Sequence, residues 1–117
     1  MAGYLTTHVL DTVRGKPASG LEIELFRIDG ETRTFVARKF TNADGRTDGA
    51  ILPEDMFAPG VYELVFRAGN YLRTTGQAAG EPLFLDEVPI RFGMSEATHY
   101  HVPLLLSPHA FSTYRGS

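Results

Sequence analysis

The chain has 117 residues, with 11 basic and 14 acidic side chains, a formal net charge of −3 and no cysteine. This length predicts a single domain, residues 1–117, whose own core is large enough to stabilise it without disulfides. The scattered charges do not form the basic surface that nucleic-acid binding needs, and no long apolar run predicts a signal peptide or a membrane span. We therefore expect a cytoplasmic protein that binds neither nucleic acid nor membrane.

Short segments in which apolar and polar residues alternate account for most of the chain. They predict β-strands, because successive side chains of a strand point to opposite faces. Taken in chain order, the predicted strands are 4–13, 21–28, 33–41, 61–69, 87–94 and 99–107. Pro89 in the fifth of these indicates an edge strand or a bend, because proline lacks the backbone N–H that a central strand uses.

The segments between these strands are rich in turn-forming residues, as in RGKPASG (14–20) and TNADGRTDG (41–49). Residues 74–84, TTGQAAGEPLF, lack alternation, and we expect a short helix there. Strands at such regular spacing are typical of an all-β fold in which two sheets form a β-sandwich.

The last predicted strand carries the first candidate site residues. His99 and His101 are two positions apart and therefore point to one face. The other face, which we expect to lie in the core, carries Tyr100, Val102, Leu104 and Leu106. His8 lies on the first strand, and Arg46 closes a tight turn. Taken singly, each of these has an ordinary structural interpretation, since most strand histidines are surface or hydrogen-bonded residues and most turn arginines are solvated.

A zinc site is one chemical interpretation of the histidines. Two imidazoles two positions apart on a strand are a known ligand spacing, and His8 would supply a third nitrogen beside His99 and His101. No neighbouring carboxylate that would orient a metal-bound imidazole is evident. The sequence also contains no nucleophile elbow or phosphate-binding loop.

Five segments of the chain together match one known pattern. They are, in order, LTTHVLDTVRGKPASG (5–20), TNADGR (41–46), FLDEVPIRFG (84–93), HYHVPLLLSP (99–108) and the terminal YRGS (114–117). With these segments the chain resembles the 5-hydroxyisourate hydrolases, the transthyretin-related enzymes of urate breakdown. The closing YRGS is the most specific segment, because it separates these hydrolases from transthyretin itself, which shares the fold and carries thyroid hormone.

The resemblance implies a transthyretin-like β-sandwich of seven or eight strands with one short helix, assembled as a homotetramer. In this tetramer two dimers would enclose a channel that holds the active sites. The implied reaction opens the six-membered ring of 5-hydroxyisourate by hydrolysis of an amide bond, without a cofactor or a metal. The residues that the resemblance implies for the site are His8, Arg46, His101, Tyr114 and Ser117, with His99 on the same face.

Such a reaction needs an activated water molecule and stabilisation of a developing oxyanion. We expect His101 or His8 to be the base that activates water, because histidine titrates near neutral pH. We expect Arg46 to stabilise the tetrahedral intermediate, and Ser117 to orient water or substrate. The residues expected to contact the substrate are His8, Arg46, Tyr114 and His99.

Two rival interpretations remain open at this point. A transthyretin-like small-molecule carrier would keep the sandwich and the channel, but it would not require His8, Arg46 and the YRGS end together. A zinc-dependent hydrolase would use His8, His99 and His101 as metal ligands.

Overall fold

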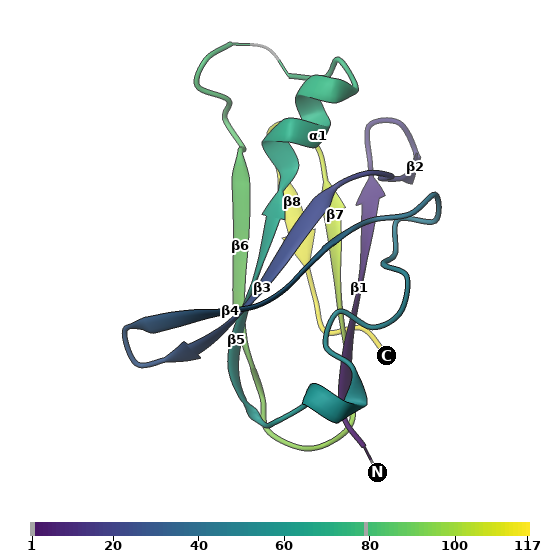
Figure 1. Cartoon of the computed structure of the whole chain (residues 1–117). Helices are drawn as coiled ribbons and strands as arrows, with labels where there is room; N and C mark the ends of the chain where they lie inside the picture. The colour runs from purple at the N-terminus through teal and green to yellow at the C-terminus, as the bar shows by residue number, and fades with distance from the viewer. Residues whose placement is uncertain (1, 79) are drawn as a thin grey trace.

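The computed structural model describes residues 2–78 and 80–117 (Figure 1). The elements within these residues are β1 (Tyr4–Asp11), β2 (Lys16–Pro17), β3 (Glu22–Asp29), β4 (Thr32–Phe40), the 3₁₀ helix η1 (Glu54–Met56), β5 (Gly60–Arg67), α1 (Ala68–Thr74), β6 (Glu87–Met94), β7 (His99–Leu106) and β8 (Phe111–Thr113). Every strand that the alternation predicts is present, and the short strands β2 and β8 are additional.

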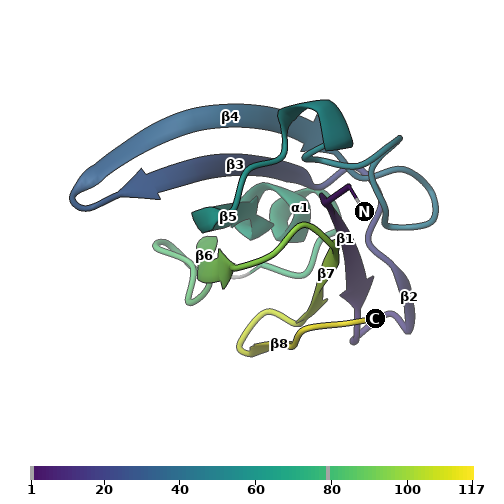
Figure 2. The same ribbon diagram turned by 90° about the horizontal axis from the view of Figure 1, so that it is seen from below.

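The strands form two four-stranded sheets that pack against each other (Figures 1 and 2). One sheet has the strand order β2-β1-β7-β8, and the other has the order β4-β3-β5-β6. Neighbouring strands are antiparallel except for β1 and β7, which run parallel. This two-sheet sandwich with one short α-helix confirms the predicted fold class. β6 lies at the edge of its sheet, as Pro89 indicates.

The apolar faces of the strands fill the space between the sheets. The core side chains of β7 are at most 7% exposed, and they are the predicted set Tyr100, Val102, Leu104 and Leu106. Residues of the other strands that are completely buried include Leu5, Val9, Ile23, Leu25, Leu64 and Phe66. Burying one such side chain stabilises a fold by roughly 1.5–3 kcal/mol. The core therefore decides which side chains of β1 and β7 point outward.

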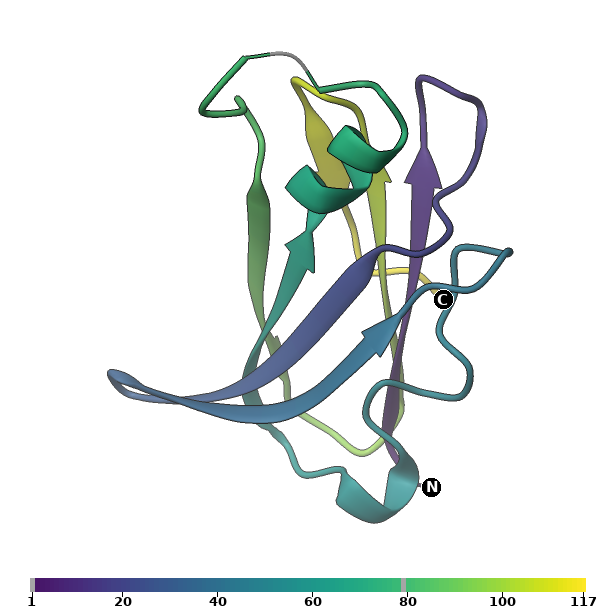
Figure 3. The ribbon, with the colours of Figure 1, turned by 45° about the horizontal axis from the view of Figure 1, so that its top comes forward.

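The helix α1 follows β5 directly and covers one end of the sandwich (Figure 3). The prediction of a helix at 74–84 is therefore wrong except at its first residue, and residue 79 lies outside the described residues. The helix begins earlier because Ala68, Tyr71 and Leu72, at helical spacing, are all buried. No helix in the described part of the chain is long and apolar enough to cross a membrane.

A buried carboxylate joins β1 to the helical end of the sandwich. Asp11 is 2% exposed, and its Oδ2 accepts hydrogen bonds from the Tyr71 hydroxyl at 2.6 Å and the Gln77 amide at 2.8 Å. Its Oδ1 accepts from the backbone N–H groups of Val13 and Arg14 at 3.1 and 2.9 Å. Burial by itself raises the pKa of Asp11, but these hydrogen bonds outweigh burial and hold the pKa below its ordinary value. Burial and the neighbouring carboxylate raise the pKa of Tyr71 to about 12.

Replacing this carboxylate should reduce stability in a pH-dependent way. Asp11→Asn removes the charge that the Tyr71 hydroxyl and two backbone N–H groups bind, and we expect a loss of about 1.5–3 kcal/mol of unfolding free energy near neutral pH. Because the folded pKa is depressed, the wild-type advantage is complete above the unfolded pKa, ordinarily 3.8, and is lost as the pH falls through the lower folded value. Urea unfolding of both proteins at several pH values measures this difference, and a difference that stays constant on acidification would contradict the role of the charge.

Candidate functional site

A cleft of about 490 Å³ lies on the outer face of the β1–β7 pair. Four of the predicted site residues line this cleft, namely Arg46, His99, His101 and Ser117. Tyr4 and Thr6 are also among the residues that line it. The lining residues come from two strands, from the loop between β4 and β5, and from the end of the chain. Figure 3 shows the C-terminus beside β1 and this loop.

The parallel pairing of β1 with β7 brings the strand residues of the cleft together. In this register Tyr4 lies opposite His99, and Thr6 lies opposite His101. Side chains at alternate positions of a strand share a face, so both strands present polar side chains outward while the residues between them enter the core. The prediction that His99 and His101 share one face is confirmed.

The two histidines of β7 are joined through one side chain of β1. The hydroxyl oxygen of Thr6 lies 2.7 Å from Nε2 of His99 and 2.7 Å from Nδ1 of His101. The ring of His99 also stacks on the ring of Tyr4, with centroids 4.2 Å apart and an angle of 6° between the planes. These contacts fix both imidazole rings and leave Nε2 as the nitrogen of His101 that is available to a ligand.

The surroundings of His101 favour its neutral form. Burial lowers the pKa of His101 most, and the positive charges of Arg46, His99 and His8 lower it further. A histidine that stays neutral near neutral pH keeps a lone pair that can take a proton from water. The cleft therefore contains a neutral imidazole, which is the form that a general base requires.

The C-terminal tail is held against His101. The backbone N–H of Gly116 donates a hydrogen bond to the His101 carbonyl at 2.7 Å. A Cβ atom at position 116 would lie 2.6 Å from Cδ2 of His101, so the close approach of the tail requires glycine. One residue further on, Ser117 also lines the cleft.

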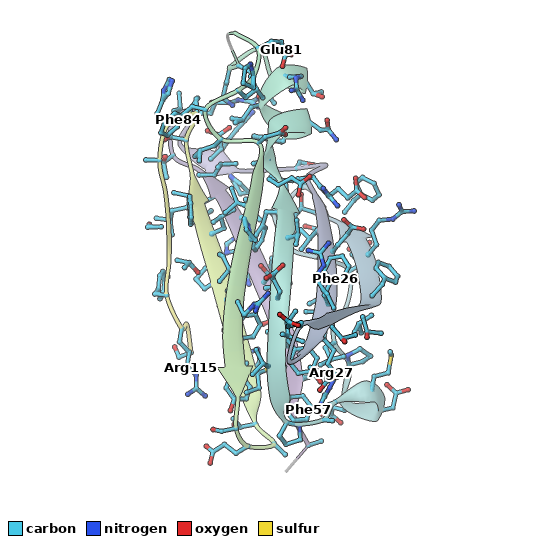
Figure 4. The ribbon with its side chains drawn as sticks, turned by 90° about the vertical axis from the view of Figure 1, so that its left-hand side faces the viewer. Phe26, Arg27, Phe57, Glu81, Phe84 and Arg115 are labelled. Carbon is cyan, nitrogen blue, oxygen red and sulfur yellow. The ribbon has the colours of Figure 1, made fainter. Side chains whose placement is uncertain are left out.

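Tyr114 lies outside this cleft. Its side chain is 60% exposed, and it lines a second cleft, of about 280 Å³, together with residues of β6 and with Arg115. The Arg115 guanidinium lies 4.4 Å from the centroid of the Tyr100 ring, and Figure 4 shows it beside β6. Within one chain the structure does not bring Tyr114 to Arg46, and its contact with a substrate stays a prediction.

The tight turn that carries Arg46 is docked onto β1. The Asn42 side chain accepts hydrogen bonds from the N–H groups of Asp44 at 2.9 Å and Arg46 at 3.2 Å. The Gly45 carbonyl accepts one from the Val9 N–H at 2.8 Å. Gly45 has a φ of +76°, and a Cβ atom there would lie 2.4 Å from the Val9 carbonyl oxygen, so this turn requires glycine. The docked turn holds the exposed Arg46 side chain at the cleft.

His8 lies beside the cleft and is not one of its lining residues. Its backbone pairs with that of Arg46, and its charge acts on His101. Its Nε2 donates a hydrogen bond to the Asp44 carbonyl at 2.8 Å. Because a carbonyl only accepts, Nε2 carries a proton, and Nδ1 is the remaining basic nitrogen of His8.

The three histidines do not converge on one point as metal ligands would. Within residues 2–78 and 80–117, no group of three or more His, Cys, Asp or Glu side chains is arranged to hold a metal ion. Thr6 contacts one ring nitrogen each of His99 and His101, and Asp44 contacts Nε2 of His8. This arrangement suits proton transfer better than it suits coordination by His8, His99 and His101.

Tyr4 and Thr6 were not among the predicted site residues. A signal was present, because both residues lie an even number of positions before His8 and so share its face of the strand. The pairing of β1 with β7 could not be predicted from the local pattern of residues. This pairing makes Thr6 a neighbour of His99 and His101.

The sequence matches one known family. The family model described as the HIUase/Transthyretin family matches residues 5–116. The chain belongs to the HIUase/transthyretin family. A 5-hydroxyisourate hydrolase of Mesorhizobium japonicum is 64% identical over 115 residues, which are 98% of this chain and 93% of that protein. The resemblance drawn from the five sequence segments is confirmed.

Three solved structures share the fold. (S)-allantoin synthase is 45% identical with a TM-score of 0.92, and the match covers 99% of this chain but only 44% of that chain. The 5-hydroxyisourate hydrolase of Klebsiella pneumoniae is 31% identical with a TM-score of 0.82, over 98% of this chain and 100% of that chain. Sea bream transthyretin in complex with thyroxine is 26% identical with a TM-score of 0.85, over 96% of this chain and 93% of that chain. The fold alone therefore does not separate a hydrolase from a thyroxine-binding protein.

The charges around His101 predict how this residue titrates. We expect NMR titration to place the pKa of His101 below that of an ordinary histidine, and Arg46→Ala to raise it because a positive neighbour is removed. Burial persists in the variant, so the rise should be partial. Arg73→Ala, which removes an exposed arginine of α1, is the matched control. An unchanged or lower pKa in Arg46→Ala would contradict this description of the cleft.

Proposed function

We propose that the chain is a 5-hydroxyisourate hydrolase, which opens the six-membered ring of this small molecule by hydrolysis of an amide bond in urate breakdown. The observation that carries the proposal is that His101, Arg46 and Ser117 line one cleft. Relatives named for this activity match the chain over nearly its whole length, which supports the same conclusion.

His101 is the base in this mechanism. Its Nε2 takes a proton from water as the water oxygen attacks the amide carbonyl carbon. The lowered pKa of His101 keeps the ring neutral, and the contact of Nδ1 with Thr6 holds the ring in place. His8 is the weaker candidate for the base, because Asp44 engages its Nε2 and it lies beside the cleft. His8 and His99 instead contact the substrate.

Arg46 stabilises the negative charge that develops on the carbonyl oxygen, since its guanidinium stays protonated and presents several N–H donors. The tetrahedral intermediate then collapses with cleavage of the C–N bond, and the proton taken by His101 passes to the leaving nitrogen. Ser117 orients the water or the substrate from the tail. The mechanism uses no cofactor and no metal.

The chain assembles in this proposal as a homotetramer of two dimers. β6 and β8 are the last strands of the two sheets, and residues of both line the second cleft, so the two edges lie on the same side of the sandwich (Figure 2). A second copy on this side would extend both sheets at once in a symmetric contact. Two such dimers would enclose the first clefts between the outer faces of β1 and β7. Tyr114 would lie in the contact between the two copies of each dimer, because it lines the second cleft.

We also propose a cytoplasmic location, which fits the absence of cysteine.

Variants of two cleft residues test the mechanism. Wild-type protein should accelerate the decay of freshly prepared 5-hydroxyisourate. His101→Asn should lower the rate by about 10²–10⁴-fold because the base is lost. Arg46→Ala should lower it by about 10²–10³-fold because an oxyanion donor is lost. Circular dichroism should show both variants folded, since neither residue belongs to the core.

The matched control is His109→Asn, which removes an exposed histidine outside the cleft. A near-wild-type rate in either cleft variant would remove that residue from the mechanism. A protein that binds thyroxine but does not accelerate the decay would be a carrier. Activity that a strong chelator removes and zinc restores would support the zinc hydrolase with His8, His99 and His101 as ligands.

One methyl group tests the position of the tail. Gly116→Ala places a Cβ atom 2.6 Å from Cδ2 of His101. The ring or the tail must then move by ~1 Å, a displacement that in a catalytic site costs on the order of 10²-fold in rate. Gly93→Ala is the matched control, because no atom outside its chain neighbours lies within 4 Å of the added methyl. Wild-type turnover in a folded Gly116→Ala protein would show that the tail does not position His101.

A further inference from the structure

The hydrogen bonds of the Thr6 hydroxyl can be counted. A threonine hydroxyl has one proton to donate and two lone pairs that accept. Ring nitrogens of His99 and His101 both lie 2.7 Å from this oxygen. The hydroxyl can donate to one ring only, so at least one of the two rings must donate its own N–H to the Thr6 oxygen.

Two neutral arrangements make an unbroken hydrogen-bond chain through Thr6, in which the hydroxyl accepts from one ring and donates to the other. They differ in what His101 presents to the cleft. In the first, Nδ1–H of His101 donates to Thr6 and Thr6 donates to Nε2 of His99, which leaves the lone pair of His101 on Nε2. In the second, Nε2–H of His99 donates to Thr6 and Thr6 donates to Nδ1 of His101, whose Nε2 then carries the proton. Of these two chains, only the first lets His101 accept a proton from water at Nε2.

We propose that Thr6 is a positioning residue that couples His99 and His101 into one proton relay, in which the proton that His101 takes from water appears as a positive charge on His99. The inference rests on the proposed hydrolase mechanism. It adds to that mechanism the group that stores the proton while the tetrahedral intermediate exists.

The relay balances in protons and charge. As water attacks, its O–H bond breaks and an N–H bond forms at Nε2 of His101. The Nδ1–H of His101 moves to the Thr6 oxygen, and the original Thr6 proton moves to Nε2 of His99, which becomes an imidazolium. When the C–N bond of the substrate breaks, the two transfers through Thr6 run backward, and His101 gives its Nε2 proton to the leaving nitrogen instead of returning it to the oxygen.

The surroundings disfavour a positive charge on His101, and they place an aromatic ring against His99. The charged and titratable groups around the pair are Tyr4 and His8 of β1 and Arg46 of the docked turn. Burial and the charge of Arg46 both oppose a proton on His101. His99 instead lies flat on the Tyr4 ring, with centroids 4.2 Å apart, and an aromatic face attracts a cation.

The central test replaces the Thr6 hydroxyl. Thr6→Val keeps the shape of the side chain and removes the hydroxyl, so kcat should fall by about 10²-fold, within the range of general acid–base contributions, with little change in KM. Thr6→Ser keeps the hydroxyl and should restore kcat to within a few-fold of wild type. Thr12→Val is the matched control, because it removes the hydroxyl of the residue that follows β1, which donates to the Leu106 carbonyl outside the cleft.

The pH profile separates a relay from simple loosening of the site. In the relay, a proton on His99 leaves His101 unable to accept a proton at Nε2. The fall of kcat at acidic pH in the wild type, the acid limb of the profile, therefore reports the protonation of the coupled pair. In Thr6→Val the limb should move to lower pH, because it then reports His101 alone, whose protonation burial and Arg46 oppose. Loosening of the site would leave the limb where it is.

A double variant tests whether Thr6 and His99 belong to one unit. His99→Gln should lower kcat by a factor similar to that of Thr6→Val, and the double variant should be no slower than the slower single variant. Losses that multiply in the double variant would overturn the relay.

Nitrogen-15 NMR of the imidazole rings gives a readout that does not depend on activity or on the stability of any variant. Near neutral pH the wild-type His101 should carry its proton on Nδ1. In Thr6→Val the proton should shift toward Nε2, because a buried Nδ1–H would lose its acceptor. If the wild type does not hydrolyse 5-hydroxyisourate, the proposed function fails while this readout still decides the coupling. A wild-type His101 protonated on Nε2, or full activity of Thr6→Val, would overturn the relay.

Discussion

The parallel pairing of β1 with β7 is the interaction on which both the core and the cleft depend. The register that buries Leu5 beside Tyr100 also places Thr6 beside His101 on the outer face. A slip of one residue would turn the histidines into the core and expose the apolar side chains. Parallel neighbours need a long crossover, and here the crossover contains the whole second sheet. The sheet that completes the core therefore also connects the two strands of the site.

The turn that carries Arg46 and the C-terminal tail add the remaining residues of the cleft, and each depends on a glycine at a close contact. At Gly45 the absence of a Cβ atom lets the turn with Arg46 approach the carbonyl of Val9. At Gly116 it lets the tail approach the ring of His101. Both contacts are to the backbone or side chains of the paired strands. Loop and terminal residues thus gain the fixed positions that catalysis needs without belonging to a long element.

Local periodicity was enough to predict the strands, the core face of β7 and the edge position indicated by Pro89. It was not enough for the helix, because the first helical turn, from Ala68, continues the apolar pattern of β5 and short apolar runs fit either structure. The contacts of Thr6 with both histidines were out of reach, since they depend on a parallel partner that lies far away in the sequence. The position of Tyr114 in a second cleft was missed because that cleft is lined in part by residues of β6, which belongs to the other sheet. The catalytic roles and the tetramer stay predictions.

A crystal structure with a non-hydrolysable analogue of 5-hydroxyisourate would test the central claim most directly. The account predicts that the carbonyl equivalent to the scissile amide lies about 2.7–3.1 Å from the Arg46 guanidinium, the reach of an oxyanion donor. Nε2 of His101 should face the carbonyl carbon, with room for one water molecule, and Ser117 should lie beside them. An analogue that binds only in the second cleft, beside Tyr114, or that turns this carbonyl away from His101, would contradict the account.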